Sequence, residues 1–178
     1  MTVKATRMQS DRIGLDHLAV ASAEDLKRLP LEVALLQNDL EMAETWADLM
    51  SIATSWRVTP LESLEHAVHY LERRLPHVLI IHWHRGSDHE HANPVTDLVH
   101  RLKRRRQQPG IGAGPFLAGT YWHDSDYYRD PTFMPFIERT YDCTIDLAEV
   151  GSDPLDTLTR ELWARLPAPP APGTPPRD

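Results

Sequence analysis

The chain is poor in cysteine: Cys143 is the only one among 178 residues. A lone thiol cannot form a disulfide within the chain or a thiolate metal cluster. The sequence also lacks any apolar run of membrane-spanning length, and its first residues, MTVKATRMQSDRIG, lack the apolar core of a secretory signal. These absences lead us to expect a cytoplasmic protein that does not associate with a membrane.

Positive charge is also scarce relative to negative charge. Lysine and arginine total 19 against 26 aspartates and glutamates, which gives a formal net charge of -7. Binding along a phosphate backbone needs a cationic surface, so this balance argues against nucleic acid as the partner. The one dense basic run, KRRRQQ at 103–108, is typical of the solvated end of a helix, where cations suit the helix dipole.

Composition changes near both ends of the chain. Residues 1–30 carry only scattered apolar positions, so we expect an N-terminal extension. Within it, SAEDLKRLP predicts a short helix with Ser22 as its cap and Asp25 at the capping-box position. Residues 167–178 read PAPPAPGTPPRD, which predicts a proline-rich disordered tail. The length and the 41% hydrophobic content between these ends suit one domain, at 31–166.

Within 31–166, strand-like and helix-like periodicity alternate, which is typical of a parallel sheet with crossover helices. Strands are predicted around 32–36, 56–60, 77–81, 115–121 and 143–150, and helices around 41–52, 64–74, 95–106 and 153–166. In the first of these helices, the spacing of Met42, Trp46, Leu49 and Met50 predicts one apolar stripe. The fold class is therefore α/β: a doubly wound, five-stranded parallel sheet with helices on both faces, flavodoxin-like, with strand order 2-1-3-4-5.

Three segments make the expectation more specific. VALLQNDLEMAETWADLM, RVTPLESLEHAVHYLERRLPHVLII and PFLAGTY resemble, in order and spacing, the opening, the middle and the fourth strand of response-regulator receiver domains. The resemblance covers about residues 31–166. It implies a place in two-component signal transduction. In that family, an aspartate at the end of the third strand accepts a phosphoryl group, and two acids after the first strand hold Mg²⁺.

This chain departs from the pattern at those positions. The acid pair maps onto Gln37 and Asn38, with Asp39 one position later, and the acceptor maps onto His82. Amides lack the charge that recruits a hard divalent cation. We therefore expect a degenerate pocket that neither holds a cofactor nor accepts a phosphoryl group on aspartate.

The remaining partners of the phosphoryl group are reduced to a single hydroxyl. The family's serine or threonine after the fourth strand maps onto Thr120, but the lysine after the fifth strand is missing, because Lys103 is the last lysine in the chain. Without metal or lysine, the charge developing on a transferring phosphoryl group has no counterweight. The resemblance thus implies a pseudo-receiver that is not an enzyme.

A second interpretation rests on HWHRGSDHEH. It brings His82, His84, His89 and His91 into one segment, and alternation along a strand puts the first two on the same side. Such a set is able to bind zinc or another transition metal. A metal- or small-ligand-binding α/β protein therefore stays open as the alternative function.

Aromatic residues gather at the end of the fourth predicted strand and in the residues that follow it. Proline prevents a long regular helix in this segment, and Tyr and Trp dominate the energetics of binding surfaces. The predicted interaction surface consists of Tyr121, Trp122, Tyr127, Tyr128 and Phe133. It predicts contact with a regulatory protein partner or with a second copy of the chain as a homodimer.

Overall fold

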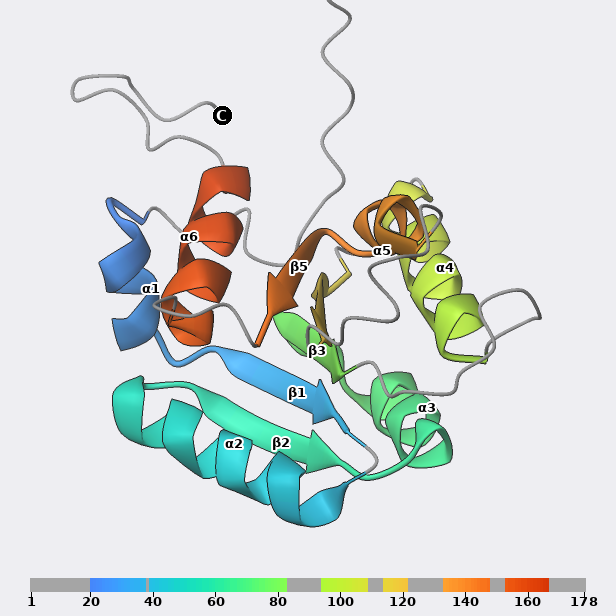
Figure 1. Ribbon diagram of the computed structural model, residues 1–178, viewed down its shortest axis with the longest axis horizontal. Coiled ribbons are helices and arrows are strands. Elements are labelled where there is room, and N and C mark those ends of the chain that lie inside the picture. The colour runs from blue at the N-terminus through green and yellow to red at the C-terminus, as the bar shows by residue number, and fades with distance from the viewer. Residues whose placement is uncertain are drawn as a thin grey trace, which may run out of the picture.

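The computed structural model describes residues 20–37, 39–82, 94–108, 114–121, 133–147 and 153–166. Its centre is one five-stranded sheet (Figure 1). The strands are β1 (Glu32–Leu36), β2 (Arg57–Leu61), β3 (Val78–His82), β4 (Phe116–Tyr121) and β5 (Cys143–Asp146). All neighbouring pairs are parallel, in the order β2-β1-β3-β4-β5. The predicted flavodoxin-like fold and its strand order are confirmed.

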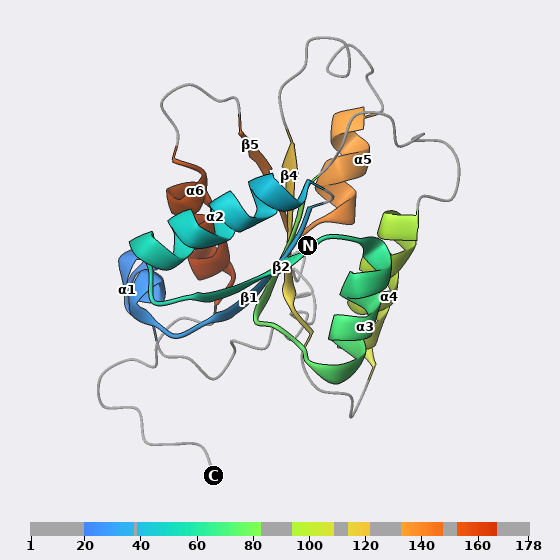
Figure 2. The same cartoon turned by 90° about the horizontal axis from the view of Figure 1, so that it is seen from below.

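Helices cover both faces of this sheet, as Figure 2 shows in a view from below. They are α1 (Ala23–Arg28), α2 (Leu40–Ala53), α3 (Leu64–Arg73), α4 (Pro94–Gln107), α5 (Phe133–Thr140) and α6 (Pro154–Arg165). One face carries α1, α2 and α6, and the other carries α3, α4 and α5. The strands alternate accordingly: Val33 and Leu35 pack under the first set, and Ala34 and Leu36 under the second. Burial on both sides explains why these strands are continuous apolar runs.

The face under α3, α4 and α5 contains a charged pair that the sequence did not predict. Arg106 is 3% exposed, and its Nη1 and Nη2 donate to the two carboxylate oxygens of Asp142, each at 2.9 Å. Asp142 also accepts the backbone N–H of Leu117 at 2.8 Å. The expectation that the whole 103–108 run is solvated is therefore wrong at Arg106, because a bidentate partner compensates its burial.

In α2, small residues face the sheet, and the predicted apolar stripe lies beside them. Ala43 and Ala47 face the sheet, at 0% and 7% exposure, whereas Leu49 is 60% exposed. Trp46 and Met50 are only partly buried. Small side chains let the helix backbone approach the strands closely, and the larger residues are displaced to the flank of the helix. The stripe therefore does not form the main contact with the sheet.

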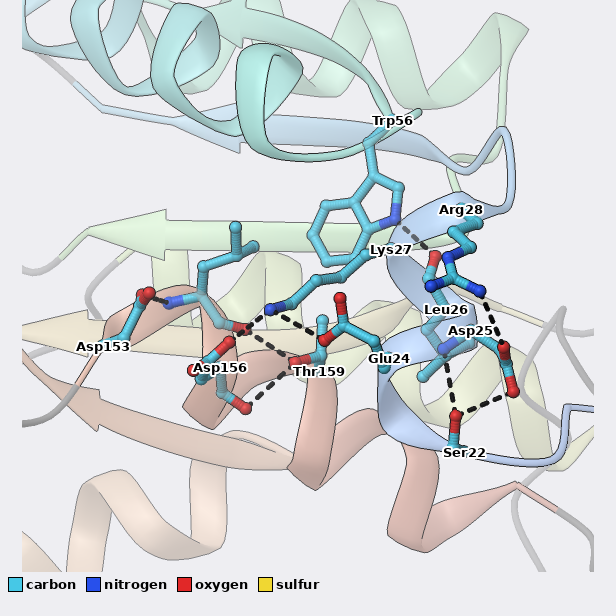
Figure 3. Close-up of polar contacts among 11 residues, drawn as sticks. Ser22, Glu24, Asp25, Leu26, Lys27, Arg28, Trp56, Asp153, Asp156 and Thr159 are labelled. Atoms are coloured by element: carbon cyan, nitrogen blue, oxygen red, sulfur yellow. Dashed lines mark hydrogen bonds and ion pairs between the residues drawn. The ribbon is translucent and has the colours of Figure 1, made fainter.

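Helix α1 belongs to the core under α2 and α6 (Figure 3). Ser22 caps it by accepting from the backbone N–H of Asp25 at 3.2 Å, as predicted. Leu26 is fully buried, and its carbonyl accepts the indole N–H of Trp56 at 2.8 Å. Lys27 forms an ion pair with Asp156 of α6. Residues before the sheet thus tie α6 to the rest of the domain.

Among the described residues, no helix combines the length and the apolar composition needed to span a membrane.

Candidate functional site

The predicted pocket residues lie where the strands β1, β3 and β4 reach their carboxyl ends. His82 is the last residue of β3 and is paired in register with Thr120 of β4. Gln37 directly follows β1, whose Leu36 is in register with Ile81. In open parallel sheets, this edge is the usual place for a functional site. Asn38 lies outside the described residues.

His82 occupies the predicted acceptor position as a buried side chain. It is 7% exposed, and its Nδ1 lies 3.0 Å from Oγ1 of Thr120, which is itself 3% exposed. The edge of one ring meets the face of the other where Trp46 contacts His82, with centroids 5.6 Å apart. The imidazole is therefore fixed by a hydrogen bond on one side and by an aromatic contact on the other.

Gln37 and Asp39 connect this edge of the sheet to the start of α2. Gln37 is 1% exposed; its amide N–H donates to Sδ of Met42 at 3.4 Å, and its carbonyl oxygen accepts the backbone N–H of Asp39 at 3.2 Å. The Asp39 carboxylate accepts the backbone N–H of Met42 at 3.0 Å, so it serves as the N-cap of α2. The amide and the acid at this edge both stabilise the β1–α2 turn.

The predicted aromatic surface is only partly described. Tyr121 is 7% exposed and packs in the core under α3, α4 and α5, so its ring is not available at the surface. The correction has a simple cause: Tyr121 is still part of β4 and points to the α5 side of the sheet. Phe133 begins α5, but its side chain is not described, and Trp122, Tyr127 and Tyr128 lie outside the described residues.

Sequence reasoning missed the exposed apolar residues of α2. Leu49 and Ile52 are 60% and 84% exposed. They are three positions apart, so they are neighbours on the helix surface. The signal was present in the sequence, but an apolar stripe does not reveal whether it faces a sheet, a groove or solvent.

The metal alternative depends on residues beyond the description. His84, His89 and His91 lie outside the described residues, and within the described ranges no group of three or more His, Cys, Asp or Glu side chains could hold a metal ion. The histidine-rich segment therefore stays a prediction, which metal analysis of protein purified without a histidine tag would test.

No family model and no curated protein matches this chain. Solved structures match its fold. Full-length FixJ from B. japonicum aligns over 76% of this chain and 58% of its own length, with 14% identity and a TM-score of 0.51. The pseudo-receiver domain of the CikA protein aligns over 77% and 98%, with 18% identity and a TM-score of 0.51.

A structure described as an atypical orphan response regulator with a phosphorylation-independent regulatory mechanism aligns over 76% of this chain and 95% of its own, with 12% identity and a TM-score of 0.51. A structure described as an adenylate cyclase from Rhodopirellula baltica has a TM-score of 0.53 at 12% identity, over 77% and 90%. This chain therefore has the flavodoxin-like fold that these receiver and pseudo-receiver structures share. At such identities the likeness defines the fold, and activity has to be argued from the site.

Proposed function

We propose that this protein is a pseudo-receiver that acts in signalling or regulation through protein–protein contacts, independently of phosphorylation and without phosphoryl-transfer activity. The observation that carries the proposal is the burial of His82 and the contacts that hold its side chain. A phosphoryl acceptor has to meet its donor in line, whereas this imidazole is buried, hydrogen-bonded to Thr120 and packed against Trp46.

The charges around the pocket support the same conclusion. Transfer of a phosphoryl group needs cations that neutralise its developing charge. Gln37 offers a neutral amide that already bonds within the β1–α2 turn, and the carboxylate of Asp39 caps α2. The chain has no lysine after Lys103, and β5 ends at an acid, Asp146. Neither the metal site nor the cationic partner of a working receiver has a counterpart among these residues.

Two of the structural neighbours make this type of function reasonable for the fold. One is described as a pseudo-receiver domain, and another as an orphan response regulator with a phosphorylation-independent mechanism. A receiver-like sheet is thus found in one protein described as having a phosphorylation-independent mechanism and in another described as a pseudo-receiver. For this chain, the argument comes from its own pocket.

The test is incubation with acetyl phosphate and Mg²⁺, followed by intact mass measurement at neutral pH, since a phosphoryl group on histidine is labile in acid. A phosphorylation-competent receiver treated in parallel is the positive control. We expect no mass increase in this protein. A stoichiometric adduct that is absent in His82→Gln would reject the proposal and make His82 an acceptor.

The contact itself is tested through α2. Ile52 is 84% exposed, so a charge at this position does not disturb the core. If the protein is a homodimer that uses this helix, sedimentation velocity should show that Ile52→Glu weakens self-association at least about tenfold. The matched control is Ser51→Glu, which adds the same charge at the neighbouring exposed position. Equal effects of the two variants would place the contact elsewhere.

A further inference from the structure

A groove of about 420 Å³ lies between α2 and α6. Its floor is the sheet, through Ile80 of β3, Thr120 of β4 and Ile145 of β5. Its walls include Trp46 and Leu49 of α2 and Leu155 of α6. The groove is thus on the same face of the sheet as the His82–Thr120 pair, and Thr120 is common to both.

The groove exists because α2 and α6 are anchored to different elements. Helix α6 packs against α1 and β5, whereas α2 packs against β2 and β1. Lys27 of α1 pairs with Asp156, and the indole N–H of Trp163 reaches the carbonyl of Val20 at 3.4 Å. Because α1 holds α6 from one side, α2 and α6 leave space between them over the sheet.

Large apolar side chains face this space. Trp46, Leu49 and Met50 of α2 all line the groove, and Leu49 is 60% exposed. Exposed apolar surface costs about 25 cal/mol per Å² relative to its burial. The apolar stripe of α2 is therefore directed at the groove, and an apolar occupant would bury it.

The charges of the lining define what fits. The described residues that line the groove include no lysine or arginine. Their one carboxylate, Asp153, already accepts the backbone N–H of Leu155 at 2.8 Å as the cap of α6. An anion would therefore meet a carboxylate without a cation. The floor offers one hydroxyl, that of Thr120, which is 3% exposed.

The size of the groove favours a small molecule over a protein surface. Ligand sites enclose roughly 300–1,000 Å³ and are mostly apolar with a few polar groups, as here. Stable protein interfaces instead bury about 800 Å² per partner over broad, flatter areas. A groove with the sheet as its floor and helices as its walls matches the first description.

We propose that the α2–α6 groove binds a small, uncharged, largely apolar molecule with one hydrogen-bonding group directed at Thr120. Its occupancy reaches the pocket directly, because Thr120 bonds His82 at 3.0 Å and Trp46 contacts the same imidazole at 5.6 Å between centroids. A ligand that bonds the Thr120 hydroxyl or moves the indole changes the surroundings of His82. This binding goes beyond the proposed contact function and does not depend on it.

The test uses N-phenyl-1-naphthylamine, an uncharged fluorescent probe, with wild-type protein and two tryptophan variants. Ala53 lines the groove and is exposed, so Ala53→Trp fills the space without entering the core. Ser51→Trp adds the same indole at an exposed position outside the lining. We expect one probe per wild-type chain, binding at least about tenfold weaker in Ala53→Trp, and unchanged binding in Ser51→Trp.

A second readout separates groove binding from general adhesion to apolar surface. Saturation with the probe should shift the imidazole NMR signals of His82, assigned through His82→Gln. Wild-type protein that does not bind the probe below about 1 mM would overturn the proposal. Equal loss in both tryptophan variants, or unmoved His82 signals, would also overturn it. So would loss of probe binding as the protein concentration is raised, because a second copy would then be the occupant.

Discussion

The face of the sheet under α3, α4 and α5 is closed around a buried ion pair, whereas the face under α1, α2 and α6 keeps a groove of about 420 Å³. On the closed face, Arg106 of α4 reaches Asp142 at the start of β5, and Asp142 in turn holds the backbone of β4. On the open face, α2 and α6 are held by different neighbours.

This difference assigns separate tasks to the two faces. Polar bonds on the closed face fix helix α4 to the strands, so we expect the loss of one partner there to destabilise the domain. The residues of the degenerate pocket, His82 and Thr120, point to the open face together with Ile80 and Ala118, because side chains alternate along a strand. The proposed ligand site is thus on the face that keeps a groove between its helices.

The strongest test of the closed face is Arg106→Met. It removes the bidentate partner of the Asp142 carboxylate, 12% exposed, and, among the described residues, leaves only the longer ion pair with Lys103 at 3.8 Å. Removing one member of a buried pair costs up to about 3–5 kcal/mol. Urea unfolding followed by circular dichroism should show this loss in the free energy of unfolding. Arg105→Met, at an exposed position of the same helix, is the control and should stay within about 0.5 kcal/mol of wild type.

A loss below about 1 kcal/mol, the size expected of a surface pair, would break the comparison. The closed face would then owe its stability to apolar packing alone.

The sequence predicted the strands of the sheet well, but it did not predict the difference between the two faces. Strand periodicity and length are local, so the run EVALL predicted β1 at Glu32–Leu36 without reference to the rest of the chain. Arg106 looked solvated because three other basic residues precede it, and its partner Asp142 is 36 positions away. Burial of that arginine is a tertiary property that no local pattern encodes.

The site shows the same limit. His82 and Thr120 were expected at one edge of the sheet, because each lies at the carboxyl end of a parallel strand. In the structure they form a hydrogen bond with each other. The contact of Trp46 with His82 was not expected, since it depends on the distance at which Ala43 and Ala47 hold α2 above the sheet. The resemblance to receivers identified positions but gave no information about the groove beside them.

A second substitution, at Gly119, tests whether the closed face tolerates added volume, and its expected loss of stability is smaller. A Cβ at Gly119 would lie 2.6 Å from Cδ2 of Tyr141, a distance that forces the ring to move. Gly119→Ala should therefore lower the free energy of unfolding by about 1–3 kcal/mol. Ala53→Trp adds far more volume in the groove but should cost less than about 0.5 kcal/mol, as for other exposed positions.

Chemical denaturation of both variants at the same pH provides the measurement. Tyr141→Leu offers a check, because the double variant with Gly119→Ala should lose less than the sum of the single losses. Equal costs at Gly119 and Ala53 would remove the distinction between a filled and an open face.

Helix caps permit a matched comparison between the faces. Ser22 caps α1 and Ser63 caps α3, accepting backbone N–H groups at 3.2 and 3.1 Å. Either change to alanine should cost about 1 kcal/mol of stability. Only Ser22→Ala should also change the affinity for N-phenyl-1-naphthylamine, because α1 anchors α6 at the groove. If Ser63→Ala altered probe binding equally, α1 would have no special part in keeping the groove open.

The smallest expected effect on stability at neutral pH concerns Cys143. This residue packs under the open face and is buried, at 7% exposure. Burial raises the pKa of its thiol from an ordinary value of 9.0 to about 12, against the opposing influence of Arg165. The folded protein therefore holds this proton more tightly than the unfolded chain. Its contribution to stability is complete below about pH 9 and is lost as the pH rises towards 12.

Comparison with Cys143→Ala isolates this contribution. The difference in unfolding free energy between the two proteins should be constant from pH 6 to 8, as both are neutral at this position. Above about pH 9, wild type should lose up to about 1.4 kcal/mol per pH unit relative to the variant. If the thiol is buried in this way, iodoacetamide should alkylate it slowly in the native protein at pH 8 and fast in urea. A difference that is independent of pH through 11 would mean that water reaches the thiol, and that the open face is wetter than its packing indicates.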